Sequence, residues 1–113
     1  MDNCLFCKFV NKEIDTSIVY EDSDMIIIND IAPKAPIHML LIPKVHYKYL
    51  HDQKANEAEL LGKCLHKLST MRTQLGLHNG YRLVINQGDD AGQTVPHLHV
   101  HILSGKVMDW NPA

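Results

Sequence analysis

Apolar residues in the first half of the chain gather into short runs that are separated by turn-forming residues. The runs at 18–20 and 25–29 are rich in β-branched side chains and flank a polar turn, which predicts a β-hairpin. Pro33 and Pro36 predict a loop after this hairpin, because proline removes a backbone donor and restricts the residue before it. The apolar run at 37–42 predicts a third strand, which carries a single polar side chain.

Two segments have the apolar spacing of amphipathic helices. Residues 4–13 predict a short helix, and residues 55–75 predict a long one with its charged side chains on the opposite face. Gly76 provides a stop for the long helix. The apolar positions behind these predictions are Leu5, Phe6, Phe9 and Val10 in the first helix and Leu61, Cys64, Leu65, Leu68, Met71 and Leu75 in the second.

The last third of the chain predicts two more strands joined by a loop. Residues 81–86 predict a strand, the Gly/Asp-rich residues 87–94 predict the loop, and Pro96 leads into a strand at 97–103. The element order is thus a meander of strands, a long helix and two further strands. This order predicts an α+β fold in one domain over residues 1–113, with a mostly antiparallel five-stranded sheet, one long helix and a short N-terminal helix.

Three histidines alternate with apolar residues in the last predicted strand. Successive side chains of a strand point to opposite faces, so His97, His99 and His101 share one face. The apolar residues between and after them share the other face, which we expect to lie against the core. Three imidazoles on one face each need a hydrogen-bond partner and repel one another if charged, which favours a function over chance placement.

Three interpretations fit this histidine face: satisfied polar groups in a half-exposed sheet, zinc ligands of a hydrolase, or a covalent nucleophile with two supporting imidazoles. The first and third histidines of an extended strand lie about 13 Å apart, so one ion can bind at most two adjacent ones. In the covalent mechanism the middle residue, His99, is an unprotonated nucleophile whose neighbours fix its tautomer and charge.

The loop before the histidines offers uncharged hydrogen-bond donors. Gly88 and Gly92 let backbone N–H groups approach an oxyanion closely. Asn86, Gln93 and Thr94 add side-chain donors that suit a phosphate. An ordinary turn explains this loop equally well when it is considered alone, and only the neighbouring histidines favour the functional interpretation.

Cys4 and Cys7 form a Cys-x-x-Cys pair that suits zinc, with two plain thiols or a redox pair as alternatives. The βαβ context of a redox pair is absent, and His46 with one of the strand histidines could complete four zinc ligands. Cys64 falls on the apolar face of the long helix and is expected in the core. His38 is alone on an apolar strand, where a satisfied core or edge histidine is the default interpretation.

Composition and charge limit the possible partners. The 113 residues include 11 basic and 13 acidic ones in mixed order with a net charge of −2, and no basic stripe suits a nucleic-acid polymer. No apolar run approaches the roughly 20 residues of a membrane span, and no basic leader opens the chain. We therefore expect a soluble, cytoplasmic protein without a membrane partner. So short a chain gains from a second subunit or a metal, and three cysteines favour thiols or metal ligands over disulfides.

The histidine segment and its context resemble the histidine triad (HIT) family, whose signature is His-φ-His-φ-His-φ-φ with φ apolar. Residues 97–103 match this signature at every position. The closing residues 105–112 resemble the Hint branch, the purine nucleoside phosphoramidases, more than the dinucleoside polyphosphate hydrolases of the family. The resemblance extends over nearly the whole chain, through residues 30–38, 42–46, 86 and 92–95. It implies a HIT-like fold and hydrolysis of purine nucleoside 5′-phosphoramidates of the AMP-amine or AMP-lysine type.

The resemblance also implies roles in catalysis. His99 would attack the α-phosphorus and carry the nucleotidyl group until water hydrolyses it. His101 would bind phosphate oxygens, and His38 would complete the hydrogen-bonded relay around the nucleophile. The residues that would hold the phosphate and the leaving group are Asn86, Gln93 and Thr94, and Thr94 would serve catalysis with the hydroxyl that many relatives supply from serine.

Substrate recognition and metal binding are implied in the same way. Asp30 would accept hydrogen bonds from the ribose hydroxyls. The apolar site for the purine would comprise Leu5, Phe6, Phe9, Ile14, Ile28, Asn29 and Ile31. In zinc-bearing relatives the ligands match Cys4, Cys7, His46 and His97, so zinc would be structural and catalysis would need no cofactor.

The resemblance further implies a homodimer, with the long helix and the strand after it at the interface and the tail near the partner's active site. Here Asp109 and Asn111 flank Trp110, where relatives often have His and Pro, so the leaving-group preference stays open. Three alternative functions also stay open: a dinucleoside polyphosphate hydrolase of the same family, a zinc hydrolase that uses the triad as ligands, and a non-catalytic module that binds a nucleotide or a partner protein.

Overall fold

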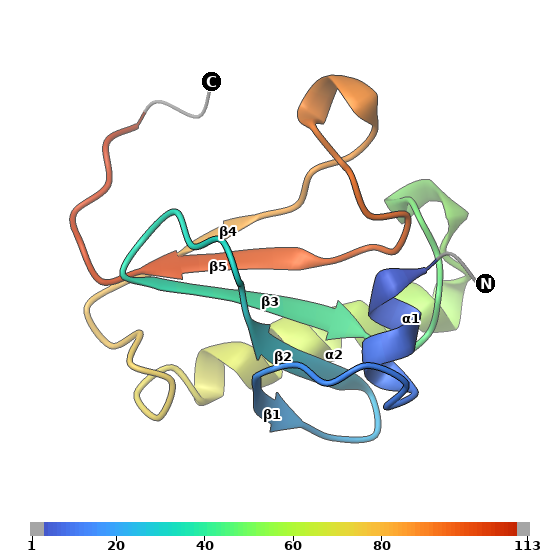
Figure 1. Ribbon diagram of the computed structural model, residues 1–113, viewed down its shortest axis with the longest axis horizontal. Coiled ribbons are helices and arrows are strands. Elements are labelled where there is room, and N and C mark those ends of the chain that lie inside the picture. The colour runs from blue at the N-terminus through green and yellow to red at the C-terminus, as the bar shows by residue number, and fades with distance from the viewer. Residues whose placement is uncertain (1–3, 111–113) are drawn as a thin grey trace.

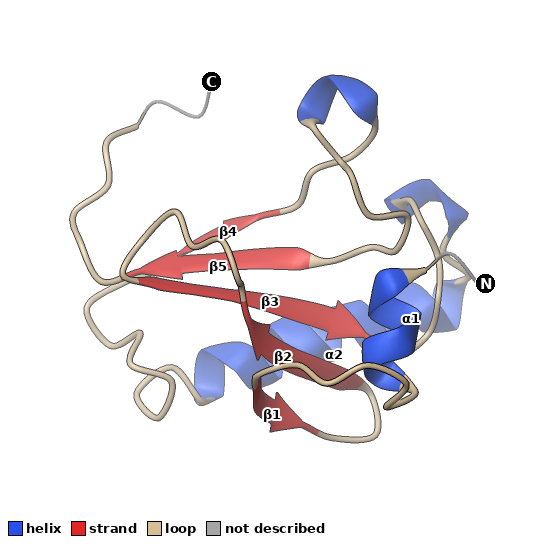
Figure 2. Ribbon diagram, in the orientation of Figure 1, coloured by secondary structure: helices blue, strands red, loops and turns tan. Residues whose placement is uncertain are grey.

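The computed structural model describes residues 4–110, in which an antiparallel sheet carries helices on both faces (Figure 1, Figure 2). The spatial order of its five strands is β1-β2-β3-β5-β4, and every pairing is antiparallel. The strands are β1 (Ile18–Glu21), β2 (Met25–Asn29), β3 (Ile37–Pro43), β4 (Arg82–Val84) and β5 (Val100–Ser104). The predicted α+β architecture is confirmed.

The helices cover opposite faces of the sheet because alternate strand residues point to opposite sides. Ile27 of β2 shares a buried cluster with Cys64 of the long helix, whereas its neighbour Ile26 shares one with Phe6 of the short helix. No helix within residues 4–110 is long and apolar enough to cross a membrane. The helical elements are α1 (Leu5–Val10), α2 (Ala55–Thr70) and the 3-10 turns η1 (Leu50–Asp52) and η2 (Asp89–Ala91).

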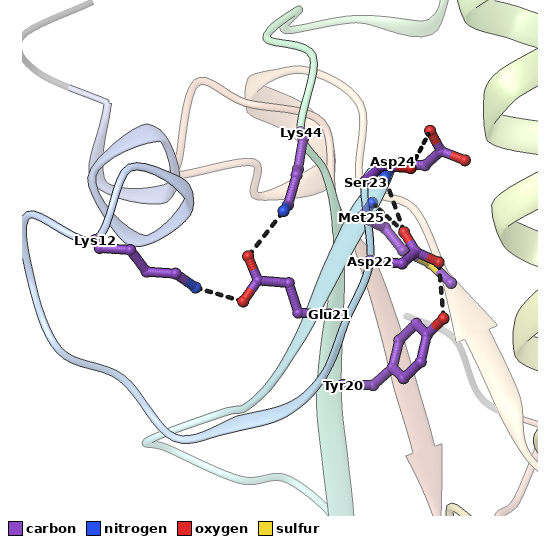
Figure 3. A network of polar contacts seen from close by, with 8 residues as sticks. All are labelled: Lys12, Tyr20, Glu21, Asp22, Ser23, Asp24, Met25 and Lys44. Carbon is purple, nitrogen blue, oxygen red and sulfur yellow. Dashed lines mark hydrogen bonds and ion pairs between the residues drawn. The ribbon is translucent and has the colours of Figure 1, made fainter.

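A network of polar contacts closes the β1–β2 hairpin (Figure 3). The Asp22 carboxylate accepts the backbone N–H groups of Asp24 and Met25 at 2.8 and 3.0 Å and the hydroxyl of Tyr20 at 2.8 Å. Burial opposes ionisation of Asp22, but these hydrogen bonds outweigh it and hold the pKa of the carboxyl below its usual value. The polar turn predicted between the two strands therefore forms around one aspartate.

Glu21 joins three segments beside this hairpin (Figure 3). Its carboxylate pairs with Lys12, in the segment after α1, and with Lys44, which follows β3 and lies 2.8 Å away. Hydrogen bonds from Lys12 and then Lys44 lower the pKa of Glu21. Exposed ion pairs of this kind add little stability, but these two tie the chain that leaves α1 to the sheet.

The long helix ends earlier than predicted, at Thr70 instead of Leu75. The hydroxyls of Ser69 and Thr70 each donate to a backbone carbonyl of the preceding turn, at 2.7 Å. Such local bonds compete with continuation of a helix. A tight turn follows over residues 71–76 and ends at Gly76, whose φ of +79° is readily adopted only by glycine. The 3.6-residue period could not detect this ending, because Leu75 still packs against the core.

The strand that contains the histidine segment begins later than predicted. β5 begins at Val100, so His97 and His99 precede it and only His101 lies within it. The backbone before β5 is engaged elsewhere: the Leu98 N–H donates to the Tyr47 carbonyl at 2.7 Å instead of joining the sheet ladder. β4 is also shorter than the predicted 81–86, because its pairing with β5 stops at Val84.

The predicted alternation of side chains nevertheless extends through this segment. Leu98 is buried against Tyr47, and Val100 and Ile102 are buried in the cluster on the α2 side of the sheet. The rings of His97 and His99 point the other way, toward α1. Core and chemistry are thus separated as the sequence predicts, although two of the three histidines lie outside the strand.

Candidate active site

A cavity of about 280 Å³ opens between α1, the end of β2 and the segment that leads into β5. Its lining combines apolar side chains, most of them from the first half of the chain, with hydrogen-bonding groups from both halves. This combination suits a small ligand that has an apolar part and a polar part. The lining residues are Leu5, Phe6, Phe9, Thr16, Ile28, Asn29, Asp30, Ile31, Leu40, Asn86, Gly92, Thr94, Val95, His99 and His101.

α1 forms the apolar wall of this cavity. The ring of Phe6 is buried and meets the ring of His99 edge to face, with centroids 4.8 Å apart. Phe9 stacks beside Phe6 at 6.0 Å. Ile31 is 98% exposed and lies at the rim of the cavity. These surfaces can hold a flat apolar ring without reading the hydrogen-bonding groups on its edge.

His99 is buried and has a defined tautomer. Its Nδ1–H donates to the backbone carbonyl of His97 at 2.8 Å, which leaves the lone pair on Nε2. Burial lowers the pKa of His99 more than this hydrogen bond raises it, so the ring stays neutral at neutral pH. A neutral imidazole with an unprotonated Nε2 is the form that acts as a nucleophile.

His38 and His101 form a hydrogen-bonded pair beside this nucleophile. The backbone N–H of Lys34 donates to His38 Nδ1 at 2.9 Å, so the proton of His38 lies on Nε2. That proton is donated to His101 Nδ1, 2.9 Å away, which leaves the proton of His101 on its own Nε2. Burial, and after it the nearby His99 and His38, lower the pKa of His101. His101 is therefore a neutral hydrogen-bond donor at the cavity.

Asp30 completes this group from the turn after β2. Its Oδ2 lies 3.3 Å from His38 Nε2, and its Oδ1 accepts the backbone N–H of Ala32 at 2.8 Å. A carboxylate held in this way keeps further lone pairs for a ligand at the cavity, which it helps to line.

Gln93 shapes the loop before the histidines and does not line the cavity. Its Oε1 accepts the backbone N–H of Gly88 at 2.9 Å, and its Nε2 donates to the carbonyl of Lys48 at 3.0 Å. The next residue, Thr94, does line the cavity. Gly92, with φ of +79°, turns the chain at the cavity wall in a conformation that favours glycine.

A second group of side chains fits a metal ion on the other side of α1. Cys4 Sγ, Cys7 Sγ, His46 Nδ1 and His97 Nδ1 converge, with separations of 3.1 to 3.4 Å between most of these atoms. Tetrahedral zinc with bonds of about 2.0 to 2.3 Å needs ligand atoms roughly 3.3 to 3.8 Å apart. His97 Nε2–H donates to the Pro43 carbonyl at 2.8 Å, which directs the Nδ1 lone pair toward the other three ligands. The donor set therefore fits zinc, and most of the separations lie within a few tenths of an ångström of the range that zinc needs.

Burial favours the neutral forms of both imidazoles and of the Cys7 thiol in this cluster, as their pKa values show. Burial lowers the pKa of His97 to about 4 and also lowers that of His46. Burial, and after it the neighbouring Cys4, raise the pKa of Cys7 to about 12. A bound divalent cation would reverse this effect at Cys7, because a coordinated thiol is deprotonated.

A third group, Asp30, His38 and His101, also brings possible ligand atoms together, but its hydrogen bonds do not fit a metal. His38 Nδ1 is occupied by the Lys34 N–H, and the other nitrogen carries the proton that His101 accepts. A metal at this place would have to displace that proton. In the described residues the candidate metal groups also divide the triad, since His97 belongs to one, His101 to the other and His99 to neither.

Comparison with known proteins identifies the family. A family model for the HIT domain matches residues 11–108. The chain belongs to the HIT domain family. It is 46% identical to Protein HitA of Neisseria gonorrhoeae over 107 residues, 95% of this chain and 100% of that protein. It is 44% identical to the 14 kDa zinc-binding protein of Zea mays over 110 residues, 96% of this chain and 86% of that protein.

A solved structure supports the same family. The HIT family hydrolase from Legionella pneumophila Philadelphia 1 superposes with a TM-score of 0.91 at 41% identity, covering 98% of this chain and 100% of that one. The predicted membership of the histidine triad family and the HIT-like fold are confirmed. The Hint branch within the family stays a prediction, because these relatives are HitA-like and HIT-like proteins.

The HIT domain brings most of the predicted site residues to the cavity. Three of them lie elsewhere: Ile14 is 41% exposed and outside the lining, Gln93 braces the loop, and His38 stands behind His101. The predicted zinc ligands converge as a separate group. Of the tail, Asp109 and Trp110 are described and contact Arg82, whereas Asn111 lies outside the described residues.

Three cavity residues of the HIT domain were not predicted. Leu40 follows His38 by two positions on β3 and so shares its face, a signal that the strand period contains. Val95 lies beside Thr94 in the loop whose functional interpretation was already favoured. Thr16 has no sequence signal, because only the path of the segment between α1 and β1 brings it to the cavity.

Proposed function

We propose that this HIT protein hydrolyses purine nucleoside 5′-phosphoramidates through a covalent nucleotidyl-histidine intermediate on His99. The observation that carries the proposal is the hydrogen bond from His99 Nδ1–H to the His97 carbonyl, 2.8 Å long. It leaves an unprotonated Nε2 on a buried, neutral ring at the cavity. A nucleophile prepared in this way needs no separate base to remove a proton before it attacks.

In the first step His99 Nε2 forms a bond to the α-phosphorus while the P–N bond breaks. The electron pair of that bond leaves on nitrogen, which takes a proton from water and departs as the amine. The ring is then substituted at Nε2 and still protonated at Nδ1, so it carries a positive charge that the His97 carbonyl stabilises. In the second step water attacks phosphorus, releases a proton to solvent and returns the electron pair to His99 Nε2.

We assign roles in substrate binding to the remaining cavity residues from their positions around the cavity. Asp30 accepts the ribose hydroxyls, and Asn86, Thr94 and the Nε2–H of His101 donate to the phosphate oxygens. His38 holds His101 in the donor tautomer, while Gln93 acts on the phosphate only through the loop that it braces. The purine lies between the apolar side chains, Leu5, Phe6, Phe9, Ile28 and Ile31, beside Asn29, with Ile14 beyond the cavity.

We assign the second group, Cys4, Cys7, His46 and His97, to structural zinc. When bound, zinc supplies a fixed link between α1 and the segment that carries the nucleophile. The 44% identity with a protein named as zinc-binding supports this assignment. His97 then has two structural roles: its ring binds the metal, and its carbonyl accepts the hydrogen bond from His99.

The leading alternative within the family is a dinucleoside polyphosphate hydrolase. Among the described residues that line the main cavity there is no lysine or arginine. A chain of several phosphates would leave much negative charge without a partner there. This favours a single phosphate. A non-catalytic binding module is the alternative from another class, and it predicts nucleotide binding without turnover. We further propose a homodimer formed through α2 and β4, and a cytoplasmic location.

Hydrolysis of adenosine 5′-phosphoramidate tests the proposal. We expect turnover of saturating substrate by the wild type to resist a strong chelator. It should fall at least about 10³-fold in His99→Ala, because the covalent path is lost. AMP affinity and fold should persist in the variant. His78→Ala, at an exposed histidine in the turn after α2, is the matched control and should retain full activity.

Two results would contradict the proposal. Wild-type protein that binds AMP but cleaves no phosphoramidate supports the binding module. Activity that chelation removes from a still-folded protein supports the zinc hydrolase.

A further inference from the structure

A second cavity, of about 390 Å³, adjoins the proposed nucleotide cavity on the open part of the same sheet face. The two cavities share Asp30, Asn86 and His101 as a common wall. The second cavity adds Val84 of β4 and Leu103 of β5. Val84 pairs with His101 and Leu103 pairs with His38, so both side chains lie on the face of the sheet that bears His101. The remaining lining residues are Ala32, Lys34 and His38.

In the part of the chain that the structure describes, Lys34 is the one lysine or arginine that lines either cavity. Within residues 4–110 it has no ion-pair partner. Its backbone is firmly placed, because its N–H bonds to His38 and the loop around it is closed by the Asp30 N–H, which donates to the His38 carbonyl at 2.9 Å. Pro33 precedes it and restricts the loop further. Lys34 thus lies on a fixed stretch of backbone at the wall of the second cavity, close to His38 and His101, with an exposed side chain that can reach a ligand there.

The position of this cavity relative to the nucleophile indicates what enters it. His99 lines only the first cavity, whereas His101 lines both. In a displacement at phosphorus the attacking and leaving atoms lie roughly in line. A phosphorus between His99 and His101 therefore directs its leaving group away from the nucleophile and toward the second cavity.

We propose that Lys34 selects amine leaving groups that carry a carboxylate, with an apolar chain placed on Val84 and Leu103. This inference rests on the proposed function and names the leaving group of that same site. A carboxylate matches a single cation, and the apolar walls match an aliphatic chain. A polyphosphate leaving group carries more charge than one lysine can neutralise and gains nothing from the apolar walls.

Three substrates distinguish recognition of the leaving-group carboxylate from cleavage of the P–N bond. These are adenosine 5′-phosphoramidate, the phosphoramidate in which leucine is linked to AMP through its amino group, and the methyl ester of that leucine compound. For each protein, kcat/KM for the acid is divided by kcat/KM for the ester. We expect this ratio to fall roughly fivefold in Lys34→Gln and further in Lys34→Glu, the size of a partly exposed ion pair. Lys63→Gln, on the exposed side of α2, should leave the ratio unchanged.

Each other outcome overturns a defined part of the inference. An equal ratio in wild type and Lys34→Gln, with all three substrates cleaved, overturns the role of Lys34 and leaves the proposed function standing. If Lys34→Gln lowers kcat/KM for diadenosine polyphosphate more than for the leucine compound, the group that Lys34 recognises is a phosphate and not a carboxylate. A wild type that cleaves none of the phosphoramidates overturns the proposed function, and the inference with it.

Discussion

Two backbone groups set the protonation of the histidines at this site. The carbonyl of His97 accepts a hydrogen bond from Nδ1 of His99, and the N–H of Lys34 donates one to Nδ1 of His38. These bonds leave the lone pair of His99 on its Nε2 and place the proton of His38 on its Nε2. Backbone groups do not titrate, so the arrangement holds as long as the imidazoles stay neutral.

The pH dependence of turnover follows from the same residues. Burial lowers the pKa of His101 below its ordinary value of 6.5. Burial lowers the pKa of the nucleophile His99 as well. Each ring loses its neutral form only as the pH falls through its own lowered pKa, so we expect the acid limb of the kcat/KM profile to lie below pH 6.5. Measuring kcat/KM from pH 4 to 9 locates the limb, and an NMR titration of the His101 ring assigns it. A limb at or above the ordinary value would contradict the buried, neutral pair.

At the scale of elements, α1 depends on tertiary contacts. With six residues it is too short to be stable alone. Its N-cap, Cys4, accepts the Cys7 N–H at 3.2 Å, so the two proposed zinc ligands also close its first turn. The residues between and after them form the wall of the cavity. Metal binding, helix formation and the shape of the proposed purine site are therefore coupled in one element.

Zinc removal should reveal this coupling. We expect about one zinc per chain, and we expect chelation to lower the Tm by at least about 10 °C, because structural zinc contributes several kcal/mol to a domain of this size. KM for the nucleotide should rise several-fold as α1 loosens. In a Cys4→Ser/Cys7→Ser variant the chelator should change neither Tm nor KM. Metal analysis, calorimetry and kinetics on one preparation test this, and metal-free protein with an unchanged Tm refutes it.

The helix boundaries show what apolar patterning misses at this scale. The long helix was predicted through Leu75 because Leu75 keeps the helical period and packs against the core. Hydrogen bonds of Ser69 and Thr70 end the helix before that. β2 and β3 were predicted more accurately than β4 and β5, because both are continuous buried runs between clear turn residues.

At the scale of the whole molecule, the sheet has two open edges, β1 and β4. β4 has only three residues. Its Leu83 pairs with Ile102, so the leucine side chain lies on the α2 face of the sheet, where it is 40% exposed. An open edge with an exposed apolar residue suits pairing with a second copy. The proposed dimer would cover this edge and leave the active-site cavity on the other face of the sheet.

Two matched substitutions test the dimer. We expect Leu83→Asp to give a monomer, because it buries a charge at the proposed interface. Val19→Asp places the same change on β1, at the opposite edge, where the valine is 39% exposed, and should remain dimeric. Sedimentation velocity distinguishes the two states. A monomeric wild type, or dissociation in both variants alike, would contradict an interface through β4.

The sequence by itself determined the type and order of the elements, the division of the histidine segment into a core side and a side that bears the histidines, and the residues that we propose for the chemistry. These properties depend on local periodicity and on side-chain type, which a sequence displays directly. Only the tertiary structure decided the tautomers and the placement of Gln93 and Lys34. The partners that decide them come from segments far apart in the chain, such as Pro43 for His97 and Lys48 for Gln93, and distant contacts leave no periodic signal.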